Sequence, residues 1–600
     1  MPWIAVVACA ALMSLASSAH SLDGSGNNVA HPGWGTAGTP YLRLAAPNYA
    51  DGRGSMVRGP SPRYVSNRIF NDVGQNLFSE NGVSQWGWAW GQFLDHDFGL
   101  RDETPAESAA IPFEASDRLE GFRNDFPGMD FARTPAAPGT GATTPREQLN
   151  TISSFIDASN VFGGTAARLE WLRTGPLDGN LSNNRASLMG ALMGRPAAAI
   201  VAGDVRANEN IALTSIHTLF AREHNRIVAA LPRGLSESAK FEMARRVVGA
   251  EIQYITYNEF LRALGVNLDR YRGYDPRVNP GLSNEFAAVG YRAHSMIHGE
   301  FEVAVEEGAY SPAQLAAFRA AGIAVTSEDD GVELAIPLNV AFGNPALLRS
   351  VGVGRVLKSL GAERQYKNDE QIDNALRSVL FQVPKPGSAD PAACGKPVVN
   401  RNCFTGIQDL GAVDIQLGRD HGIPSYNALR VAYGLAPKRS FTAITGETTA
   451  SFPRELAAEG ARAIDDPRIL EFVELRDADG KVVRSGSDEA LEDAVVGTRR
   501  TTLAARLRAV YGSVDRLDAF VGMVSERHVR GTEFGVLQLA MWKQQFEALR
   551  DGDRFFYTND PELEAIRRQY GIDYRRTLAS VIRLNTGVAV APHPFEVAGG

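Results

Sequence analysis

An aromatic-rich stretch near residue 90 carries polar groups at helical spacing. In WGWAWGQFLDHDFGL, residues 86–100, Gln92, Asp95 and His96 lie at positions i, i+3 and i+4. A helix would place this amide, carboxylate and imidazole on one face, while Asp97 points elsewhere. Polar groups crowded among Trp and Phe would be costly without a functional task, because buried carboxylates need partners. A surface helix end capped by Asp-His-Asp would show the same pattern.

A second stretch, GDVRANENIALTSIHTLFAREHNRIVAAL at residues 203–231, places Arg206 and Glu209 three residues apart where a helix begins. The apolar residues that follow predict a long amphipathic helix. An ordinary i, i+3 ion pair, which contributes about a few tenths of a kcal/mol, would explain the same spacing. We interpret His217 and His224 as structural, since a lone helical histidine usually satisfies a local hydrogen bond.

A third stretch, NEFAAVGYRAHSMIHGEF at residues 284–301, offers Tyr291, Arg292, His294 and His298. A histidine that holds haem iron has its second ring nitrogen fixed by an acceptor. Asp414, in LGAVDIQLGRDHGIPSYNALR at residues 410–430, is the candidate acceptor.

The segment SSFIDAS, residues 153–159, places oxygen-bearing groups at alternate positions. Hydroxyl, carbonyl and carboxylate oxygens can converge there from one side, and oxygen ligands in that number suit calcium. The segment is not an EF-hand, because the Asp-rich loop with a glycine turn and a terminal glutamate is missing. The residues concerned are Ser153, Phe155, Asp157 and Ser159.

Helical periodicity dominates the elements that must position these groups. Apolar residues recur at spacings of three and four over 83–97, 211–231, 237–264, 285–298, 368–382, 424–433, 501–510 and 532–550. Strand-like alternation is limited to 301–305 and 332–338. Residues 22–65 are rich in Gly, Asn, Pro and Ser and predict an ordered coil packed on the surface. We therefore expect a mainly α fold.

The composition is that of a globular protein. Hydrophobic residues make up 44% and charged residues 22% of the 600 residues, which is ample material for a core and allows one large domain. The net charge is -8 with scattered positive residues, so nucleic acid is not an expected partner. Beyond the N-terminus, no apolar stretch is long enough to span a bilayer.

The N-terminus reads as a secretory signal peptide over residues 1–21, because an apolar run is followed by small residues, although no Lys or Arg precedes it. A buried first helix is the alternative. Cys9 would leave with the signal, so the mature chain would keep Cys394 and Cys403. That pair suggests a disulfide in an oxidising compartment, the alternative being two free thiols. We expect a secreted or periplasmic protein.

Taken together, these stretches resemble the animal (myeloperoxidase-like) haem peroxidases, in a bacterial-type form. GQFLDHD, SFIDAS, LTSIHTLFAREHNR, the HSM segment, IQLGRDHGIPSYN and LRDGDRFFY occur in family order across roughly residues 25–580. The resemblance implies one large helical catalytic domain, residues 66–595, with haem b in its core. It also implies reduction of hydrogen peroxide and oxidation of a small donor through a high-valent iron intermediate.

The resemblance assigns the catalytic roles residue by residue. His96 matches the distal histidine that takes a proton from peroxide and returns it to the departing oxygen. Arg206 matches the distal arginine, whose charge favours O–O cleavage. Gln92 matches the glutamine that contacts water, peroxide or halide.

Further matches concern the haem and a metal ion. His294 matches the iron ligand, and Tyr291 and Arg292 lie at the haem edge. Asp95 and Glu209 match the carboxylates that form ester bonds to haem. The implied calcium ligands are Asp97, Ser153, Phe155, Asp157 and Ser159, with Ser153 where Thr is common.

Two departures from the family bear on reactivity. Asn210 stands where myeloperoxidase has a methionine that forms a sulfonium link to haem, so that link cannot form. Iodide, bromide, thiocyanate or phenols are therefore better expected donors than chloride. Asp414 stands where an asparagine is expected, and a carboxylate there would push the imidazole of His294 toward imidazolate.

Two other functions stay open. The order Tyr291, Arg292, Ala293, His294 is similar to that of fatty-acid dioxygenases of the same superfamily, in which the tyrosine becomes a radical. Arg206 and the two ester carboxylates favour the peroxidase. An adhesion or matrix protein on a peroxidase scaffold is the second alternative, and the retained distal residues argue against it.

Overall fold

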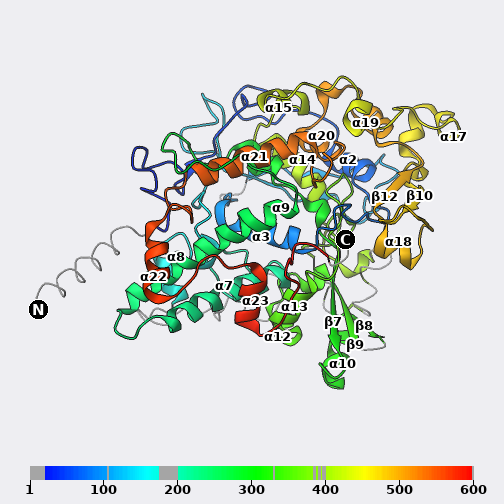
Figure 1. Cartoon of the computed structure of the whole chain (residues 1–600). Coiled ribbons are helices and arrows are strands. Elements are labelled where there is room, and N and C mark those ends of the chain that lie inside the picture. The colour runs from blue at the N-terminus through cyan, green and yellow to red at the C-terminus, as the bar shows by residue number, and fades with distance from the viewer. Residues whose placement is uncertain are drawn as a thin grey trace, which may run out of the picture.

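The computed structural model describes residues 21–103, 107–173, 200–328, 331–382, 385, 387–388, 394 and 400–597. The predicted signal peptide therefore lies outside the described residues except for Ser21. Helices are the main regular structure of the described chain, and the strands belong to small two- and three-stranded sheets (Figure 1). The predicted mainly α fold is confirmed.

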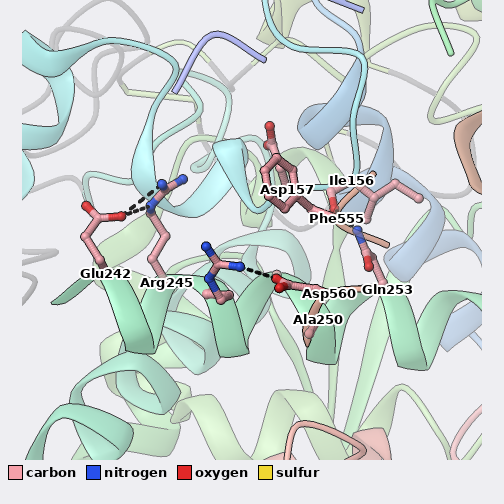
Figure 2. A pocket seen from close by; sticks show the side chains of 10 residues that line it. Ile156, Asp157, Glu242, Arg245, Ala250, Gln253, Phe555 and Asp560 are labelled. Carbon is pink, nitrogen blue, oxygen red and sulfur yellow. Dashed lines mark hydrogen bonds and ion pairs between the residues drawn. The ribbon is translucent and has the colours of Figure 1, made fainter. Parts of the chain in front are cut away.

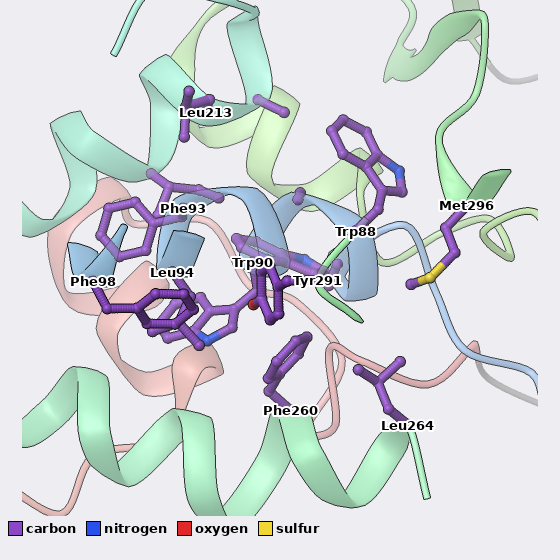
Figure 3. Close-up of a cluster of buried hydrophobic side chains, with 14 of the residues drawn as sticks. Trp88, Trp90, Phe93, Leu94, Phe98, Leu213, Phe260, Leu264, Tyr291 and Met296 are labelled. Carbon is purple, nitrogen blue, oxygen red and sulfur yellow. The ribbon is translucent and has the colours of Figure 1, made fainter. Parts of the chain in front are cut away.

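Helix α3 (Trp86–Phe98) lies at the centre of the molecule (Figure 1). Its aromatic side chains are buried among those of neighbouring helices, as Figure 3 shows for Trp90, Phe93 and Phe98. Phe93 stacks on Phe220 with 5.4 Å between ring centroids, and each such buried ring contributes about 1.5–3 kcal/mol. This packing fixes the helix that carries Gln92, Asp95 and His96.

Helix α7 (Ile211–Ala230) packs against α3 and helix α8 (Glu237–Ile255) packs against α7, and both helices confirm the predictions for 211–231 and 237–264. Helix α7 begins at Asn210, whose side chain accepts the N–H of Leu213 at 2.9 Å, and an asparagine cap of this kind stabilises a helix start. Helix α8 begins at Ser236 and continues through the π-helix η1 (Thr256–Phe260) and α9 (Leu261–Ala263).

The predicted helix over 285–298 is wrong in its middle. The chain forms the π-helix η2 (Phe286–Gly290), leaves helical geometry at Tyr291 and turns once more in the 3₁₀ helix η3 (His294–Met296). The carbonyl of Gly290 would accept the N–H of His294 in an α-helix. Instead it accepts Gln538 Nε2 at 3.0 Å and Trp542 Nε1 at 2.8 Å, so a distant helix interrupts this one.

The predicted helix over 368–382 is also wrong, because the segment consists of turns. Asp369 accepts the N–H of Gln371 at 2.7 Å, and Asp373 accepts the N–H of Ala375 at 2.7 Å. Aspartate side chains that bind nearby backbone N–H groups compete with helix formation.

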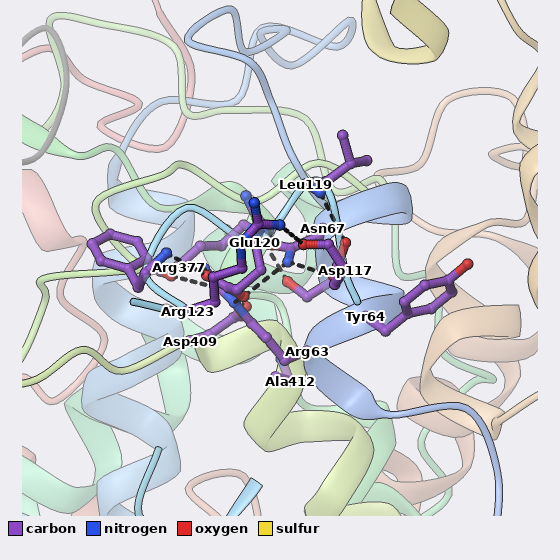
Figure 4. Close-up of polar contacts among 12 residues, drawn as sticks. Arg63, Tyr64, Asn67, Asp117, Leu119, Glu120, Arg123, Arg377, Asp409 and Ala412 are labelled. Atoms are coloured by element: carbon purple, nitrogen blue, oxygen red, sulfur yellow. Dashed lines mark hydrogen bonds and ion pairs between the residues drawn. The ribbon is translucent and has the colours of Figure 1, made fainter. Parts of the chain in front are cut away.

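Helix α14 (Leu410–Asp420), which carries Asp414, is held by buried ion pairs (Figure 4). Asp409 caps α14 and pairs with Arg63 of α2 (Pro62–Ile69) at 2.6 Å. Arg63 also pairs with Glu120 at 2.7 Å. Because all three side chains are buried, α14 has little freedom to shift.

Other predictions for the framework are largely confirmed. The predicted strands 301–305 and 332–338 are β7 (Glu300–Glu306) and β9 (Gly331–Pro337), which pair antiparallel, with β8 (Ala324–Glu328) on the other edge of β9. Residues 22–65 are mostly coil, although β1 (Thr39–Pro40) and the start of α2 lie within them. Cys394 and Cys403 form the predicted disulfide.

Further longer helices occur in the described chain. Those at 424–433, 501–510 and 532–550 were predicted and are α15 (Tyr426–Ala432), α19 (Leu503–Tyr511) and α21 (Val536–Asp551). The others are α10 (Pro312–Ala320), α12 (Pro345–Val351), α13 (Val353–Ser359), α20 (Ala519–Val524), α22 (Pro561–Tyr570) and α23 (Leu578–Thr586).

Candidate active site

The first polar cluster joins α3 to the start of α7. Gln92 donates from Nε2 to Glu209 at 2.8 Å, and its Oε1 accepts from Asn210 Nδ2 at 2.8 Å. Glu209 and Arg206 lie in the turns that precede α7. Asn210, which stands where myeloperoxidase has a methionine, therefore has two roles. Its side chain caps α7 and also holds the amide of Gln92.

Arg206 is held by carboxylates other than the one its spacing suggested. Its Nη2 donates to Asp204 at 2.7 Å, and its Nη1 lies 3.6 Å from Asp95. Among the described residues, these two carboxylates are the ion-pair partners of Arg206, so an i, i+3 pair with Glu209 is not formed. The guanidinium also donates to the carbonyl of Gly99 at 2.9 Å, at the end of α3.

His96 lies between two carboxyl groups. Its Nδ1 is 3.6 Å from Asp204, and its Nε2 is 3.8 Å from Glu209. His96 is 3% exposed, and its Nδ1 has no hydrogen-bond partner within the part of the chain that the structure describes. Burial, reinforced by the positive charge of Arg206, holds the pKa of His96 well below its usual value. The imidazole is therefore neutral near pH 7 and able to accept a proton.

The neighbouring Glu209 is perturbed in the opposite direction. Burial raises the pKa of Glu209 to about 7, with Asp204 adding to the rise and Arg206 opposing it. A carboxyl group near its midpoint at neutral pH can exchange a proton or react as the neutral acid.

The second polar cluster is a histidine–aspartate pair. Nδ1 of His294, in η3, lies 2.7 Å from Asp414 of α14. The side chain of Asp414 is 2% exposed and that of His294 is 21% exposed. Among the described residues, Nε2 of His294 has no hydrogen-bond partner. The carboxylate fixes Nδ1 as the donor and leaves Nε2 free to bind a metal.

Tyr291 connects the segment that carries His294 to α3. Its hydroxyl donates to the carbonyl of Gly91 at 3.1 Å, and its ring stacks on Trp542 at 4.6 Å. Burial, with Asp95 adding to it, raises the pKa of Tyr291 well above its usual value. Arg292 folds back and donates to the carbonyl of Ala287 at 2.8 Å.

A cavity of about 630 Å³ reaches His96 from the side of Asp204. Apolar residues such as Leu100 and Ile152 line it together with hydroxyl groups and Arg168. The cavity therefore lies on the side of His96 that faces Asp204, although Nδ1 itself is buried.

The predicted calcium ligands lie together at the C-terminal end of α3. Ser159 Oγ donates to the carbonyl oxygen of Asp97 at 2.7 Å, and Ser153 Oγ donates to Asp157 at 2.8 Å. Asp97 also accepts the backbone N–H of Ala158 at 3.1 Å. Phe155 lies on the same loop with its N–H on Ser153 Oγ at 3.1 Å.

This cluster of predicted calcium ligands carries two buried acids close to each other. Burial raises the pKa of Asp97 to about 7 and, with the charge of Asp97, raises that of Asp157 well above its usual value. Asp157 also lines a small pocket against α8, near Arg245 (Figure 2). Among the described residues, no group of three or more histidine, cysteine, aspartate or glutamate side chains is arranged as metal ligands. A cation here would bind two carboxylates plus hydroxyl and carbonyl oxygens, which suits calcium.

Sequence reasoning missed one residue of the first cluster and misjudged another. Asp204 stands two residues before Arg206 in GDVR, and that spacing was the available signal. His217, interpreted as hydrogen-bonded, has no partner for either ring nitrogen among the described residues. It packs edge-on against Phe93 at 5.1 Å, and burial lowers its pKa to about 4.

The fold thus holds one buried histidine beside Asp204 and Arg206 and a second histidine, paired with Asp414, whose Nε2 can bind haem iron. The family model of the animal haem peroxidases matches residues 19–458 and 487–595, and the chain belongs to this family. The family predicted from the sequence is confirmed. Among the described helices, none is long and apolar enough to cross a membrane.

Relatives in animals are similar over most of the chain. A human peroxidasin homolog is 28% identical, covering 90% of this chain and 34% of that protein. Thyroid peroxidase from the pig (Sus scrofa) is 28% identical, covering 96% of this chain and 60% of that protein. The chain therefore spans only part of the length of these relatives.

Two solved structures show the fold of the chain. Peroxidase A from Dictyostelium discoideum aligns with a TM-score of 0.73 and 25% identity, covering 96% of this chain and 99% of that one. A fatty acid alpha-dioxygenase from Arabidopsis thaliana aligns with a TM-score of 0.68 and 16% identity, covering 97% and 84%. The second likeness is one of fold alone.

Proposed function

We propose that this protein is a haem peroxidase that reduces hydrogen peroxide and oxidises a small donor. The observation that carries the proposal is the neutral, buried His96 set between Glu209 and the Asp204–Arg206 pair. A proton acceptor beside a fixed positive charge is what heterolysis of a peroxide bond requires.

His294 would hold the haem iron through Nε2. The free Nε2, the 2.7 Å contact between Nδ1 and Asp414 and the partial exposure of the ring fit this role. When bound, haem would supply the iron centre at which peroxide is reduced and from which donors are oxidised. Asp414 would make His294 a more electron-donating ligand than a neutral acceptor would.

His96 would take the proton of the hydroperoxide O–H and return it to the departing oxygen. Its pKa, held low by burial and by Arg206, keeps the imidazole neutral and ready to accept that proton. Arg206, whose guanidinium is hydrogen-bonded to Asp204, would stabilise the negative charge that develops on the leaving oxygen. Gln92, held by Glu209 and Asn210, would orient water or peroxide.

The donor is proposed to be iodide, bromide, thiocyanate or a phenol. Asn210 cannot form a sulfonium link, and its amide is engaged with Gln92. Strong chloride oxidation is therefore not expected. Stopped-flow spectroscopy of the haem-loaded protein with hydrogen peroxide, followed by these donors, tests the proposal. A haem spectrum that hydrogen peroxide leaves unchanged would reject it.

Asp95 and Glu209 would attach the haem through ester bonds. Glu209 is about half ionised at neutral pH because its pKa is about 7. Its carboxylate oxygen would bond to a haem methyl carbon, which would lose a hydrogen, while hydrogen peroxide, the oxidant of the proposed reaction, would be reduced to water. We predict that acidified organic solvent extracts more haem from Asp95→Ala and Glu209→Ala than from the unmutated protein. Complete extraction from the unmutated protein would show that no ester forms.

Asp97, Asp157, Ser153 and Ser159, with Phe155, would bind calcium. Two buried acids with raised pKa values need a cation to remain ionised together. Because Asp97 directly follows His96, the ion would also hold the end of α3 that carries the proton acceptor.

A fatty-acid dioxygenase is the second candidate, and the position of Tyr291 favours it. The phenol is buried and contacts α3 one residue before Gln92. Oxygen uptake with linoleate, abolished by Tyr291→Phe, would support the dioxygenase. Peroxide-dependent oxidation of iodide that survives Tyr291→Phe would support the peroxidase.

We further propose that residues 1–21 direct export and that the mature protein is secreted or periplasmic. The Cys394–Cys403 disulfide supports this proposal, because such bonds persist in oxidising compartments. A mature N-terminus near residue 22 on protein recovered outside the cytoplasm is the expected result.

A further inference from the structure

Asp204 lies beside both groups on which the proposed peroxide chemistry depends. Its Oδ1 accepts Nε of Arg206 at 3.0 Å, its Oδ2 accepts Nη2 of Arg206 at 2.7 Å, and Oδ1 lies 3.6 Å from Nδ1 of His96. The side chain of Asp204 is 2% exposed. Two parallel N–H to oxygen contacts define both the position and the plane of a guanidinium.

The backbone of Asp204 is itself fixed. Its N–H donates to the carbonyl of Asn160 at 2.9 Å, and the N–H of Gly203 donates to that of Val161 at 3.0 Å. A Cβ at Gly203 would lie 2.2 Å from the carbonyl oxygen of Ser159, so only glycine allows this approach. Asp204 is thus anchored on the short helix α4 (Ser159–Phe162), which follows the cluster of predicted calcium ligands.

We propose that Asp204 is a positioning residue that holds the guanidinium of Arg206 in line with His96. The inference rests on the proposed peroxidase function. Asp204 would contact neither peroxide nor haem and would act through Arg206. Its negative charge offsets part of the positive charge of Arg206, so its contribution is one of geometry. A side chain as flexible as arginine would otherwise sample many rotamers around the reacting oxygen.

A buried ion pair elsewhere in the molecule provides a comparison for the pair formed by Asp204 and Arg206. Arg68 and Asp117 form such a pair at 2.9 Å, with both side chains buried, in the network that holds α2. The residues labelled in Figure 4 support α14 through Asp409, but none of them is itself assigned to peroxide or haem. Asp117→Asn is therefore a matched control, because it removes a buried carboxylate charge from an arginine outside the site.

The test uses haem-loaded Asp204→Asn and Asp117→Asn, with potassium cyanide as a probe of the distal side. For Asp204→Asn we expect the first peroxide-dependent change in the haem spectrum to slow about tenfold to a hundredfold, as misplaced catalytic groups do. We also expect a weaker cyanide affinity. The resonance Raman iron–histidine band should not move, because His294 and Asp414 are untouched. Asp117→Asn should lower thermal stability and leave both distal readouts unchanged.

A double variant tests whether Asp204 acts through Arg206. If it does, Asp204→Asn/Arg206→Gln will react little more slowly than Arg206→Gln alone, because the partner is already missing. Rate losses that multiply would overturn the inference, as would an unaltered peroxide rate in Asp204→Asn.

Two further outcomes distinguish a failure of the positioning role of Asp204 from a failure of the proposed peroxidase function. If Asp204→Asn does not bind haem, Asp204→Glu keeps the charge but displaces it, and a rate equal to that of the unmutated protein would overturn the positioning role. If the unmutated protein does not react with peroxide at all, the proposed function fails first.

Discussion

Burial decides the charge state of the residues that the proposed chemistry uses. His96 stays neutral because its ring is buried beside the positive Arg206, and the pKa of Glu209 rises to about 7 because its carboxyl is buried. Neither effect can be read from residue type, since both depend on what surrounds the side chain. A proton acceptor and a partly protonated acid thus lie 3.8 Å apart.

We predict that His96→Ala binds haem but loses reactivity with peroxide. Iron ligation is assigned to His294 and proton transfer to His96, so the two properties should separate. The expected loss in the rate of peroxide reduction is roughly a hundredfold or more, as for removal of a general base. The measurement is haem content together with stopped-flow spectra. A variant that reacts at the unmutated rate would reject the role of His96.

Helix α21 determines the geometry of the element that carries His294. Gln538 and Trp542 take the carbonyl of Gly290, which ends η2 and lets the chain turn so that His294 faces Asp414. A continuous α-helix over 285–298 would have used that carbonyl internally. The interruption is therefore imposed from a segment almost 250 residues away, the sequence separation of the Gln538–Gly290 bond being 248.

We therefore predict that Trp542→Phe costs about 1–3 kcal/mol of unfolding free energy and shifts the haem spectrum of the loaded protein. The substitution keeps an aromatic ring but leaves a buried carbonyl with one donor fewer. Chemical denaturation and the Soret band are the measurements. Trp171→Phe, at a side chain 37% exposed, is the control that should change neither. An unshifted Soret band in Trp542→Phe would contradict the account of η2.

The buried pair Asp97 and Asp157, which we propose to bind calcium, links the stability of the whole molecule to pH. In the calcium-free protein the pKa of Asp97 is raised to about 7 and that of Asp157 is raised further above its usual value. Unfolded aspartates lose their protons near pH 4, so the folded state binds more protons than the unfolded chain above that pH. The contribution of these groups to stability therefore falls as pH rises from about 4 through 7.

We predict that calcium raises the melting temperature more at pH 8 than at pH 5.5. Calcium favours the ionised carboxylates, so it offsets a penalty that grows with pH. Differential scanning calorimetry with calcium or with a chelator is the measurement, and Asp157→Asn should lose most of the difference. Equal calcium effects at the two pH values would argue against the site.

Local pattern alone determined much of this protein. Spacing of three and four placed Gln92, Asp95 and His96 on one helical face, and alternation found β7 and β9, because both signals come from residues that are neighbours in sequence. Motifs in order gave the family, and the cysteine pair gave the disulfide.

Tertiary structure decided what depends on distant partners. The bond from Arg206 to the carbonyl of Gly99, the break in the helix before His294 and the edge-on contact of His217 with Phe93 all follow from packing between elements. Residues 368–382 form turns and not the predicted helix, because the side chains of Asp369 and Asp373 accept nearby backbone N–H groups. Periodicity reports which face of a segment is apolar, but the hydrogen-bond partners of its polar groups are set only when the chain has folded.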